Sequence, residues 1–292
     1  MSPSLPRLTS CLLGQIRHRR NPPRPSPGSC VPTSSPSTSR SAAGRRPSGV
    51  SRWVENHWSL RWDLPEGASF ASEVLPHPTC SLTVERGDHP RPALAGEEVV
   101  ITGVVTRRFD VEIRGSGRVA GLRFRPGGLA ALTGQSARAW TDRTVAASPA
   151  VATEVVRALA AIDLDGDVEA GMGGVEAAFP EHLGEDARYD RVLRVVADLL
   201  SDRTVVTVRD LEERHGVSGR TLQRDFLHYV GVGPKWVLGR HRMHDVVVAL
   251  DGGYEGSLTE LAVAHGWYDQ AHFTRDFTAL VGVPPSRYRS RT

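Results

Sequence analysis

The chain has 292 residues, 39% of them hydrophobic, and a formal net charge of +3 at pH 7. This length accommodates two modest domains and a tail, whereas no apolar run approaches the ~20 residues needed to span a bilayer and the start lacks the apolar core of a signal peptide. We therefore expect a cytoplasmic protein without a membrane partner. Its cysteines, Cys11, Cys30 and Cys80, are widely spaced with no CxxC pair, so they indicate neither a disulfide framework nor a zinc site.

Residues 1–50 form a segment rich in Ser, Pro, Arg and Gly, with eight arginines and no acidic residue. Such a composition buries too little apolar surface to offset the entropy of ordering, so we predict a disordered basic tail. One interpretation is an arm that adds nonspecific affinity for DNA. We favour another, in which the segment is not part of the natural protein and translation starts at a Val codon such as Val50 or Val54, because the arginines lack the pattern of a DNA-binding arm.

Residues 51–147 are predicted to form a small antiparallel β domain, of sandwich or barrel type, with a sensing or regulatory role. Its segments are short and strand-like, and Gly, Pro and Asp separate them. Gly115-Ser116-Gly117 predicts a hairpin turn, and a short helix is expected at Leu129–Leu132. The predicted strands lie in the tryptophan-rich segment VENHWSLRWDL and at 80–85, 98–106, 109–114 and 118–125.

Two groups of side chains in this domain are candidates for ligand chemistry. His57, His77 and His89 are candidate metal ligands of a cupin-like barrel, but they lack the clustered HxH spacing of such a site, so we favour scattered surface histidines and expect no metal or other cofactor. Arg123 and Arg125 alternate with apolar residues and therefore share one face of a strand. They are candidates for holding an anionic ligand, although we favour a solvated or ion-paired face.

Residues 148–185 are predicted to form a helical linker region. Apolar residues from Val151 to Ile162 recur on one helical face, Gly166–Gly174 predicts a loop, and a second apolar stripe starts at Tyr189. Helices of this kind pair with their copies in a homodimer or form part of the core of their own chain. The sequence leaves both alternatives open.

Two stretches of the last region, 186–292, repeat one pattern. Residues 211–234 and 261–285 each contain a short amphipathic run ending in His-Gly, a polar turn, a second run with Arg-Asp-Phe, and then Val-Gly-Val and proline. The copies are 50 residues apart at the glycines and 51 apart at Arg-Asp-Phe, so the second turn has one extra residue. A helix, a tight glycine turn and a second helix form a helix-turn-helix unit, and two copies indicate double-stranded DNA as the partner.

Each predicted unit has a positioning helix followed by a recognition helix. In the first, Asp210–His215 precedes the Gly216 turn, and a helix at Gly219–Tyr229 buries Leu222 and Phe226. In the second, the recognition helix buries its phenylalanines in the same way. The outward or capping polar side chains of the two units, which are of the types that contact bases and phosphates, are Ser218, Arg220, Thr221, Gln223, Arg224, Lys235, Asp269, Gln270, His272, Thr274 and Arg275.

A connecting helix is expected between the units, at Lys235–Leu250, with Pro234 opening its first turn. At ~1.5 Å per residue it is ~24 Å long and stiff enough to hold the recognition helices about one DNA turn, ~34 Å, apart. One chain is therefore expected to enter two successive major grooves.

Three motifs carry a resemblance to a known family: GVSGRTLQRDF at Gly216–Phe226, GWYDQAHFTRDF at Gly266–Phe277 and GVPPSRYR at Gly282–Arg289. In these residues the chain resembles the AraC/XylS family of bacterial transcription regulators. The upstream segment Gly121–Gly127 resembles, more weakly, a strand of an AraC-associated N-terminal domain. The resemblance implies a sequence-specific regulator that binds a DNA operator, and it leaves RNA polymerase, a small-molecule effector and a second copy of the chain open as further partners.

Two residues depart from the family pattern. Glu212 stands where the family, and the second copy at Ala262, has a small residue packed against the recognition helix. Val246 replaces an alanine of the connecting helix. We therefore expect looser packing in the first unit than in the second.

The sequence as a whole predicts an α+β chain that is not an enzyme. The alternative is a cupin-like metal-dependent enzyme, or a small-molecule-binding protein, with an accessory DNA-binding domain. An enzyme of that kind needs a metal triad, which the sequence lacks. A regulator that also repairs alkylated DNA needs a nucleophilic cysteine in a zinc-type cluster, and Cys80 alone does not supply one.

Overall fold

The computed structural model describes residues 17–19, 37–39, 49–74, 76–89, 96–107, 109–180, 185–202 and 204–290. In the predicted tail it describes β1 (Arg17–Arg19), β2 (Ser37–Ser39) and the last two residues. The rest of the tail lies outside the described residues, so its disorder stays a prediction. Within the described ranges, no helix has the length and apolar character required to cross a membrane.

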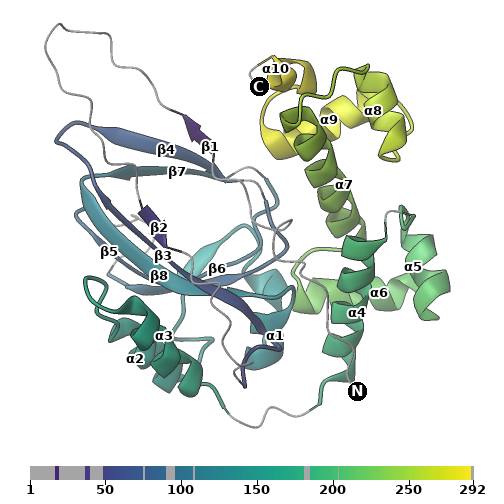
Figure 1. Cartoon of the computed structure of the whole chain (residues 1–292). Coiled ribbons are helices and arrows are strands. Elements are labelled where there is room, and N and C mark those ends of the chain that lie inside the picture. The colour runs from purple at the N-terminus through teal and green to yellow at the C-terminus, as the bar shows by residue number, and fades with distance from the viewer. Residues whose placement is uncertain are drawn as a thin grey trace, which may run out of the picture.

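Two antiparallel sheets make up the β domain (Figure 1). One has the strand order β1-β4-β7, and the other has the order β2-β3-β8-β5-β6-β9. Fully buried side chains of the larger sheet, such as Leu82, Leu122 and Phe124, form part of the hydrophobic core. The bounds are β3 (Val54–Asp63), β4 (Ser69–Val74), β5 (Ser81–Gly87), β6 (Val99–Thr102), β7 (Phe109–Arg114), β8 (Ser116–Phe124) and β9 (Thr144–Ala146).

All five predicted strand regions are confirmed. β4 and β9 were missed because SFASEV does not alternate strictly between apolar and polar residues and the three residues of β9 are too few to show a period. The hairpin predicted at Gly115-Ser116-Gly117 is wrong. β7 pairs with β4, while β8 pairs with β3 and β5. The chain thus passes from one sheet to the other at Gly115, since a glycine-rich turn marks a bend without specifying which strand will be the partner.

Four short helices come after β8, with β9 between the second and the third: α1 (Gly128–Thr133), η2 (Ala137–Ala139), α2 (Thr153–Ala160) and α3 (Val168–Ala177). The short helix predicted at Leu129–Leu132 is confirmed by α1. The loop predicted at Gly166–Gly174 is wrong, because α3 occupies most of it. The Asp167 side chain accepts the backbone N–H of Ala170 at 3.0 Å, and Met172 and Val175 are fully buried, so capping and burial outweigh the low helix propensity of glycine.

The last region is helical, as predicted, and α7 lies above α4 next to the β domain (Figure 1). The recognition helix of the first unit has the predicted bounds, and α7 extends the predicted connecting helix by one residue at each end. The bounds are α4 (Ala187–Ser201), α5 (Val208–His215), α6 (Gly219–Tyr229), α7 (Pro234–Asp251), α8 (Leu258–Ala264), α9 (Gln270–Val281) and α10 (Pro285–Arg289).

The described residues bury two separate apolar cores. The larger runs from the β domain through α2, α3 and α4 into α5 and α6, and ends at Val237 and Leu238 of α7. The smaller begins at Met243 of the same helix and contains the buried residues of α8, α9 and α10. The predicted α+β class is confirmed, and the first helix-turn-helix unit shares its core with the β domain, whereas the second has its own.

Candidate nucleic-acid interface

Unit 1 (α5, the Gly216 turn and α6) and unit 2 (α8, the Gly266 turn and α9) both turn at a glycine. Gly216 has φ of 62° and Gly266 has φ of 80°, a left-handed conformation that favours glycine. The hydroxyl of Ser218 accepts the backbone N–H of Thr221 at 3.3 Å, and the Asp269 carboxylate accepts that of His272 at 2.7 Å. Both predicted N-caps are confirmed, so each recognition helix starts with its free N–H groups partly satisfied.

The outer face of α6 carries the side chains predicted for it. Arg220, Gln223 and Arg224 are exposed and Thr221 is half-buried, while Leu222 and Phe226 are buried on the opposite face. The guanidinium of Arg224 lies 3.7 Å from the Asp225 carboxylate, and its side chain is 67% exposed. It is therefore accessible to a ligand outside the helix.

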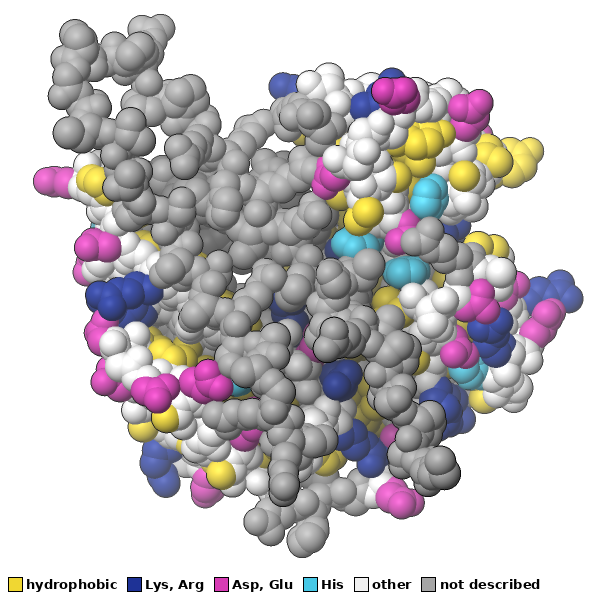
Figure 2. All heavy atoms as spheres, viewed as in Figure 1, with side chains coloured by type: hydrophobic (Ala, Val, Ile, Leu, Met, Phe, Trp, Pro, Cys, Tyr) yellow, Lys and Arg dark blue, Asp and Glu magenta, His cyan; other side chains and the backbone are white. Residues whose placement is uncertain are grey.

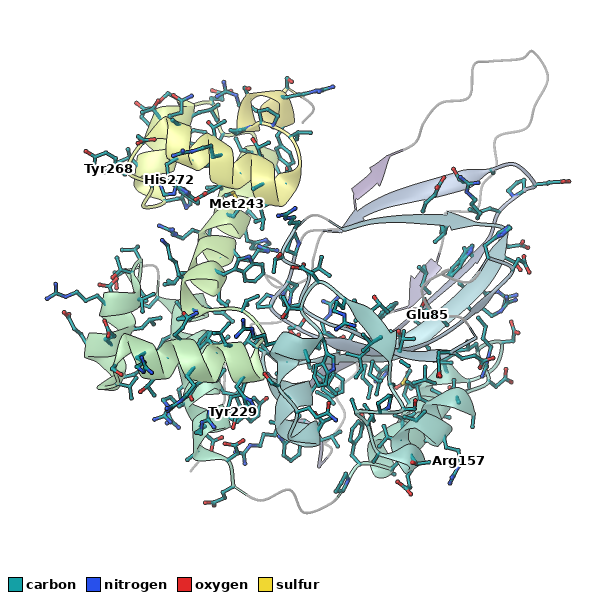
Figure 3. The ribbon with its side chains drawn as sticks, turned by 180° about the vertical axis from the view of Figure 1, so that it is seen from behind. Glu85, Arg157, Tyr229, Met243, Tyr268 and His272 are labelled. Atoms are coloured by element: carbon teal, nitrogen blue, oxygen red, sulfur yellow. The ribbon has the colours of Figure 1, made fainter. Side chains whose placement is uncertain are left out.

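The outer face of α9 is similar. Gln270, His272 and Arg275 are exposed, and Thr274 is half-buried. The Gln270 side chain accepts the hydroxyl hydrogen of Thr259 at 2.7 Å, which orients it from α8. Sequence reasoning missed Tyr268, the neighbour of the Asp269 cap, which is 92% exposed and projects from unit 2 near His272 (Figure 3).

The 18 residues of α7 join the two units, one at each end of the helix (Figure 1). At ~1.5 Å per residue the helix is ~27 Å long. Lys235, in its first turn, is exposed. Basic and acidic side chains are interspersed over the visible helical surface (Figure 2), so the placement of individual arginines, and not overall charge, marks the candidate interface.

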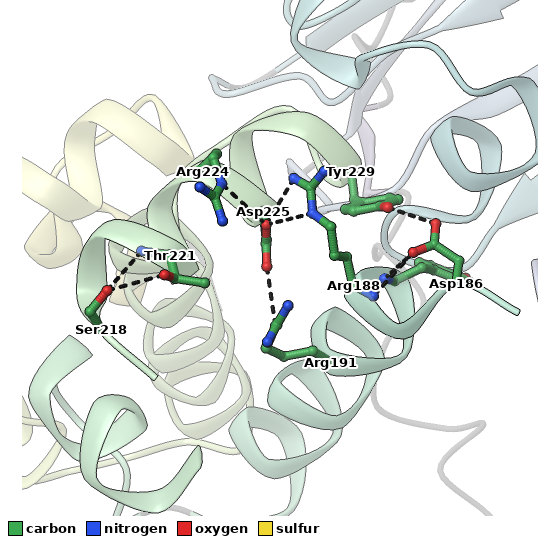
Figure 4. A network of polar contacts seen from close by, with 9 residues as sticks. Asp186, Arg188, Arg191, Ser218, Thr221, Arg224, Asp225 and Tyr229 are labelled. Carbon is green, nitrogen blue, oxygen red and sulfur yellow. Dashed lines mark hydrogen bonds and ion pairs between the residues drawn. The ribbon is translucent and has the colours of Figure 1, made fainter. Parts of the chain in front are cut away.

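An ion-pair cluster that sequence reasoning missed holds α6 against α4 (Figure 4). Asp225 is 1% exposed. Its carboxylate accepts two hydrogen bonds from Arg188, at 2.9 and 3.0 Å, and one from Arg191 at 3.1 Å. Bonding to Asp225 raises the pKa of the Arg188 guanidinium. The signal in the sequence was the acid repeated in both Arg-Asp-Phe copies.

A second contact joins the C-terminal end of α6 to the start of α4. The Tyr229 hydroxyl donates to Asp186 at 2.6 Å, and Asp186 also caps α4 by accepting the N–H groups of Arg188 and Tyr189. Burial alone would raise the pKa of Asp186, but the hydrogen bonds from Tyr229 and from the backbone hold it below its usual value. The recognition helix is thus fixed to α4 at two levels.

In unit 2 the corresponding acid, Asp276, bonds within the unit. Its carboxylate accepts the indole N–H of Trp267 at 2.9 Å and lies 3.2 Å from a ring nitrogen of His272. Arg242 of α7 stacks on Trp267, with 4.7 Å between the guanidinium carbon and the ring centroid, and donates to the Gly266 carbonyl at 2.8 Å. Arg242 therefore connects the recognition turn of unit 2 to the connecting helix.

The looseness expected from Glu212 is not what the structure shows. The Glu212 carboxylate accepts the backbone N–H of Gly219 at the start of α6. A side chain at Gly219 would meet that carboxylate, at 2.9 Å from the added Cβ. In unit 2 the same two places hold Ala262 and Gln270, so the larger residue is on the other helix and both units remain closely packed.

The candidate ligand residues of the β domain are spread over it. Arg123 and Arg125 both act on Glu55, whose pKa they lower against the larger, raising effect of burial. Arg125 also donates to the Ser51 carbonyl at 2.9 Å. Among the described residues, no three His, Cys, Asp or Glu side chains are placed to hold a metal ion. His57 lies on β3, and His77 and His89 lie outside strands.

Comparisons with known proteins agree with the helix-turn-helix geometry of the last region. Residues 211–291 match a family described as a helix-turn-helix domain, and residues 47–146 match a domain of unknown function, DUF6597. No curated protein matches the chain. The C-terminal domain of AraT, a response regulator from Geobacillus stearothermophilus, is 22% identical, covers 37% of this chain and 89% of its own, and has a TM-score of 0.33.

A structure of ToxT from Vibrio cholerae is 11% identical over 80% of this chain and 98% of its own, with a TM-score of 0.39. At these TM-scores neither structure decides how the two halves of this chain are arranged. The family match covers both units, and the geometry of their turns, caps and exposed faces agrees with it. The chain is therefore a DNA-binding transcriptional regulator, and its C-terminal part is a double helix-turn-helix domain of the AraC type.

Proposed function

We propose that the two units insert α6 and α9 into successive major grooves of one DNA operator. The observation that carries this proposal is the attachment of both units to one continuous helix, α7, of 18 residues. Its length, ~27 Å, brings the units to a separation near one DNA turn, ~34 Å. Arg224 and Arg275 are the proposed base contacts, because a guanidinium pairs bidentately with guanine. The proposed supporting contacts are Ser218, Arg220, Thr221, Gln223, Lys235, Asp269, Gln270, His272 and Thr274.

We further propose that the β domain, acting as the sensor of a small-molecule effector, controls DNA binding through unit 1. Three observations support this. Unit 1 and the β domain share one core. The Thr141 hydroxyl donates to the Gly231 carbonyl at 2.9 Å, just beyond α6. A Cβ at Gly127 would lie 2.9 Å from Tyr229, so the β domain approaches the recognition helix closely. A change in the β domain therefore reaches α6 through direct contacts.

The test is selection of duplexes by the full chain from a random pool. The expected site has two specified half-sites whose centres are ~10 base pairs apart, one for each recognition helix. Selection of a single half-site of one groove would contradict the proposed use of both units. Selection of no preferred sequence would contradict base readout altogether.

A further inference from the structure

Unit 2 has one residue more than unit 1 in the turn before its recognition helix, and that residue is an exposed tyrosine. In unit 1 only Val217 lies between the turn glycine and the N-cap Ser218. In unit 2 both Trp267 and Tyr268 lie between the glycine and the N-cap Asp269. Trp267 is 3% exposed, as expected of a core residue, whereas Tyr268 is 92% exposed. The additional residue therefore contributes almost nothing to the packing of unit 2.

The backbone of Tyr268 is held in place from both sides. Before it, the buried Trp267 donates its indole N–H to Asp276 at 2.9 Å. After it, the Asp269 carboxylate accepts the backbone N–H of His272 at 2.7 Å. A tyrosine on a fixed backbone loses little conformational freedom when it binds a partner, because its side chain has few rotatable bonds. Tyr268 is thus suited to be a rigid anchor for a ligand outside the protein.

Tyr268 continues the proposed DNA-binding face of α9. It lies just before the exposed Gln270 and projects from unit 2 near His272 (Figure 3). The N-terminal residues of a recognition helix contact base edges in the major groove. The adjoining Asp269 carboxylate would repel a phosphate, so an uncharged ring beside it suits a base better than the DNA backbone. The apolar group that a base presents in the major groove is the methyl group of thymine.

We propose that the ring of Tyr268 packs against the methyl group of a thymine in the half-site bound by unit 2. Unit 1 has no residue at the corresponding place, since its turn is shorter. The contact therefore specifies a base pair in one half-site only, and the two half-sites differ in length although the two units repeat one pattern. This contact rests on the proposed insertion of α9 into a major groove.

The experiment measures binding of the full chain to its selected duplex while each thymine is replaced in turn by deoxyuridine, which lacks only the methyl group. At one position, in the half-site where Arg275→Ala removes protection, the replacement should weaken binding by the parent about fourfold, the worth of one buried methyl group. Tyr268→Ala should bind the thymine duplex about fourfold or more weakly than the parent, and should not respond to that replacement.

Two further variants test whether the ring itself makes the contact. Tyr268→Phe keeps the ring and loses only the hydroxyl, so it should respond to the replacement like the parent. Val248→Ala, at an exposed apolar residue of α7, is the control and should also respond like the parent. Because Tyr268 is so exposed, Tyr268→Ala should keep the Tm of the parent, and a lost response will not reflect lost folding.

The thymine contact would be overturned by a parent that responds to no replacement, or by an equal response in the parent and in Tyr268→Ala. Equal weakening of binding to all sequences by Tyr268→Ala would mean a contact with the DNA backbone and would overturn it too. Arg275→Ala distinguishes this failure from failure of the proposed function. Lost affinity in Arg275→Ala with unchanged affinity in Tyr268→Ala would remove the tyrosine contact alone, whereas unchanged affinity in both would exclude α9 from the groove.

Discussion

Unit 1 and unit 2 repeat one design but are attached to the rest of the molecule differently. Arg191 and Arg242, on the helices before each unit, are 51 residues apart, as are Asp225 and Asp276 on the recognition helices. In unit 1 the arginine reaches the aspartate directly. In unit 2 it stacks on Trp267, which in turn bonds to the aspartate. The repeat therefore includes the preceding helix, and α4 stands to unit 1 as α7 stands to unit 2.

The residue that follows the turn glycine explains the difference, because in unit 2 it lies between the arginine and the aspartate in space. Unit 2 has Trp267 after its glycine, whereas unit 1 has Val217, which has no N–H to donate from its side chain. Asp225 instead takes its hydrogen bonds from α4, which belongs to the core of the β domain. Unit 1 is therefore built into the core of the β domain, whereas unit 2 has a separate core and is tied to α7 through Arg242.

The largest effect is expected from breaking the aspartate contacts in each unit. Asp225→Ala leaves two partly buried arginines without a carboxylate, and should destabilise the protein by about 3 kcal/mol or more. Asp276→Ala is the matched variant and leaves one indole N–H unpaired, at about 1–3 kcal/mol. Hydrogen exchange should show faster opening of α6 in the first variant and of α9 in the second. Equal costs, or opening of both helices together, would argue against separate attachment.

DNA affinity should fall next most strongly when the proposed base contacts are removed. Arg224→Ala and Arg275→Ala should each weaken specific binding by ~1–3 kcal/mol, the size of a bidentate base contact. Titration of the selected duplex measures both, with circular dichroism to verify folding. A folded variant that binds as tightly as the parent would exclude that helix from the groove.

Removal of Arg242 should affect the preferred spacing of the two DNA half-sites more than the affinity for DNA. Arg242→Ala loses a stacked cation, worth ~0.5–2 kcal/mol, and leaves unit 2 less firmly oriented on α7. Binding to the best duplex should weaken modestly, while the penalty for inserting one base pair between the half-sites should shrink. Arg209→Ala serves as control and should keep the spacing preference of the parent. An unchanged insertion penalty in Arg242→Ala would show that another contact sets the spacing.

The contact between the positioning helix and the recognition helix differs between the two units at Glu212, whose place is taken by Ala262 in unit 2. Glu212→Ala imitates unit 2 without its larger partner on the recognition helix, and should cost about 1 kcal/mol because an N-terminal N–H of α6 loses its acceptor. Glu212→Gln keeps an acceptor oxygen and should cost less. Urea unfolding of the three proteins measures the difference. Higher stability of the alanine variant would restore the expectation of loose packing in unit 1.

The smallest expected effect is on the pH dependence of Tm, and it arises from a hydrogen bond made by unit 1. Since Tyr229 and the backbone hold the pKa of Asp186 below its usual value, the folded state gains stability that is complete above the unfolded pKa, about 3.9. This stability is lost as the pH falls through the lower, folded pKa. Tyr229→Phe should therefore flatten the fall in Tm on acidification. A parallel fall in parent and variant would mean that this hydrogen bond does not contribute.

Local sequence pattern was sufficient to predict the helix-turn-helix units. Their signals act within one helix or between helices that are adjacent in the sequence, as do the caps Ser218 and Asp269 and the buried Phe226. It was not sufficient where partners are distant. Nothing near Asp225 in the sequence indicates that arginines of α4 will pair with it. The sheet change at Gly115 was missed for the same reason, since it depends on which strands meet in the folded chain.

The most direct test of the account is a hydroxyl-radical footprint of the full chain on its selected duplex, compared with footprints of the Arg224→Ala and Arg275→Ala variants. The parent should protect two successive groove faces ~10 base pairs apart. Each variant should lose protection at a different one of the two faces and keep the other. Protection of one face by the parent, or loss of the same face in both variants, would contradict the claim that both recognition helices bind DNA.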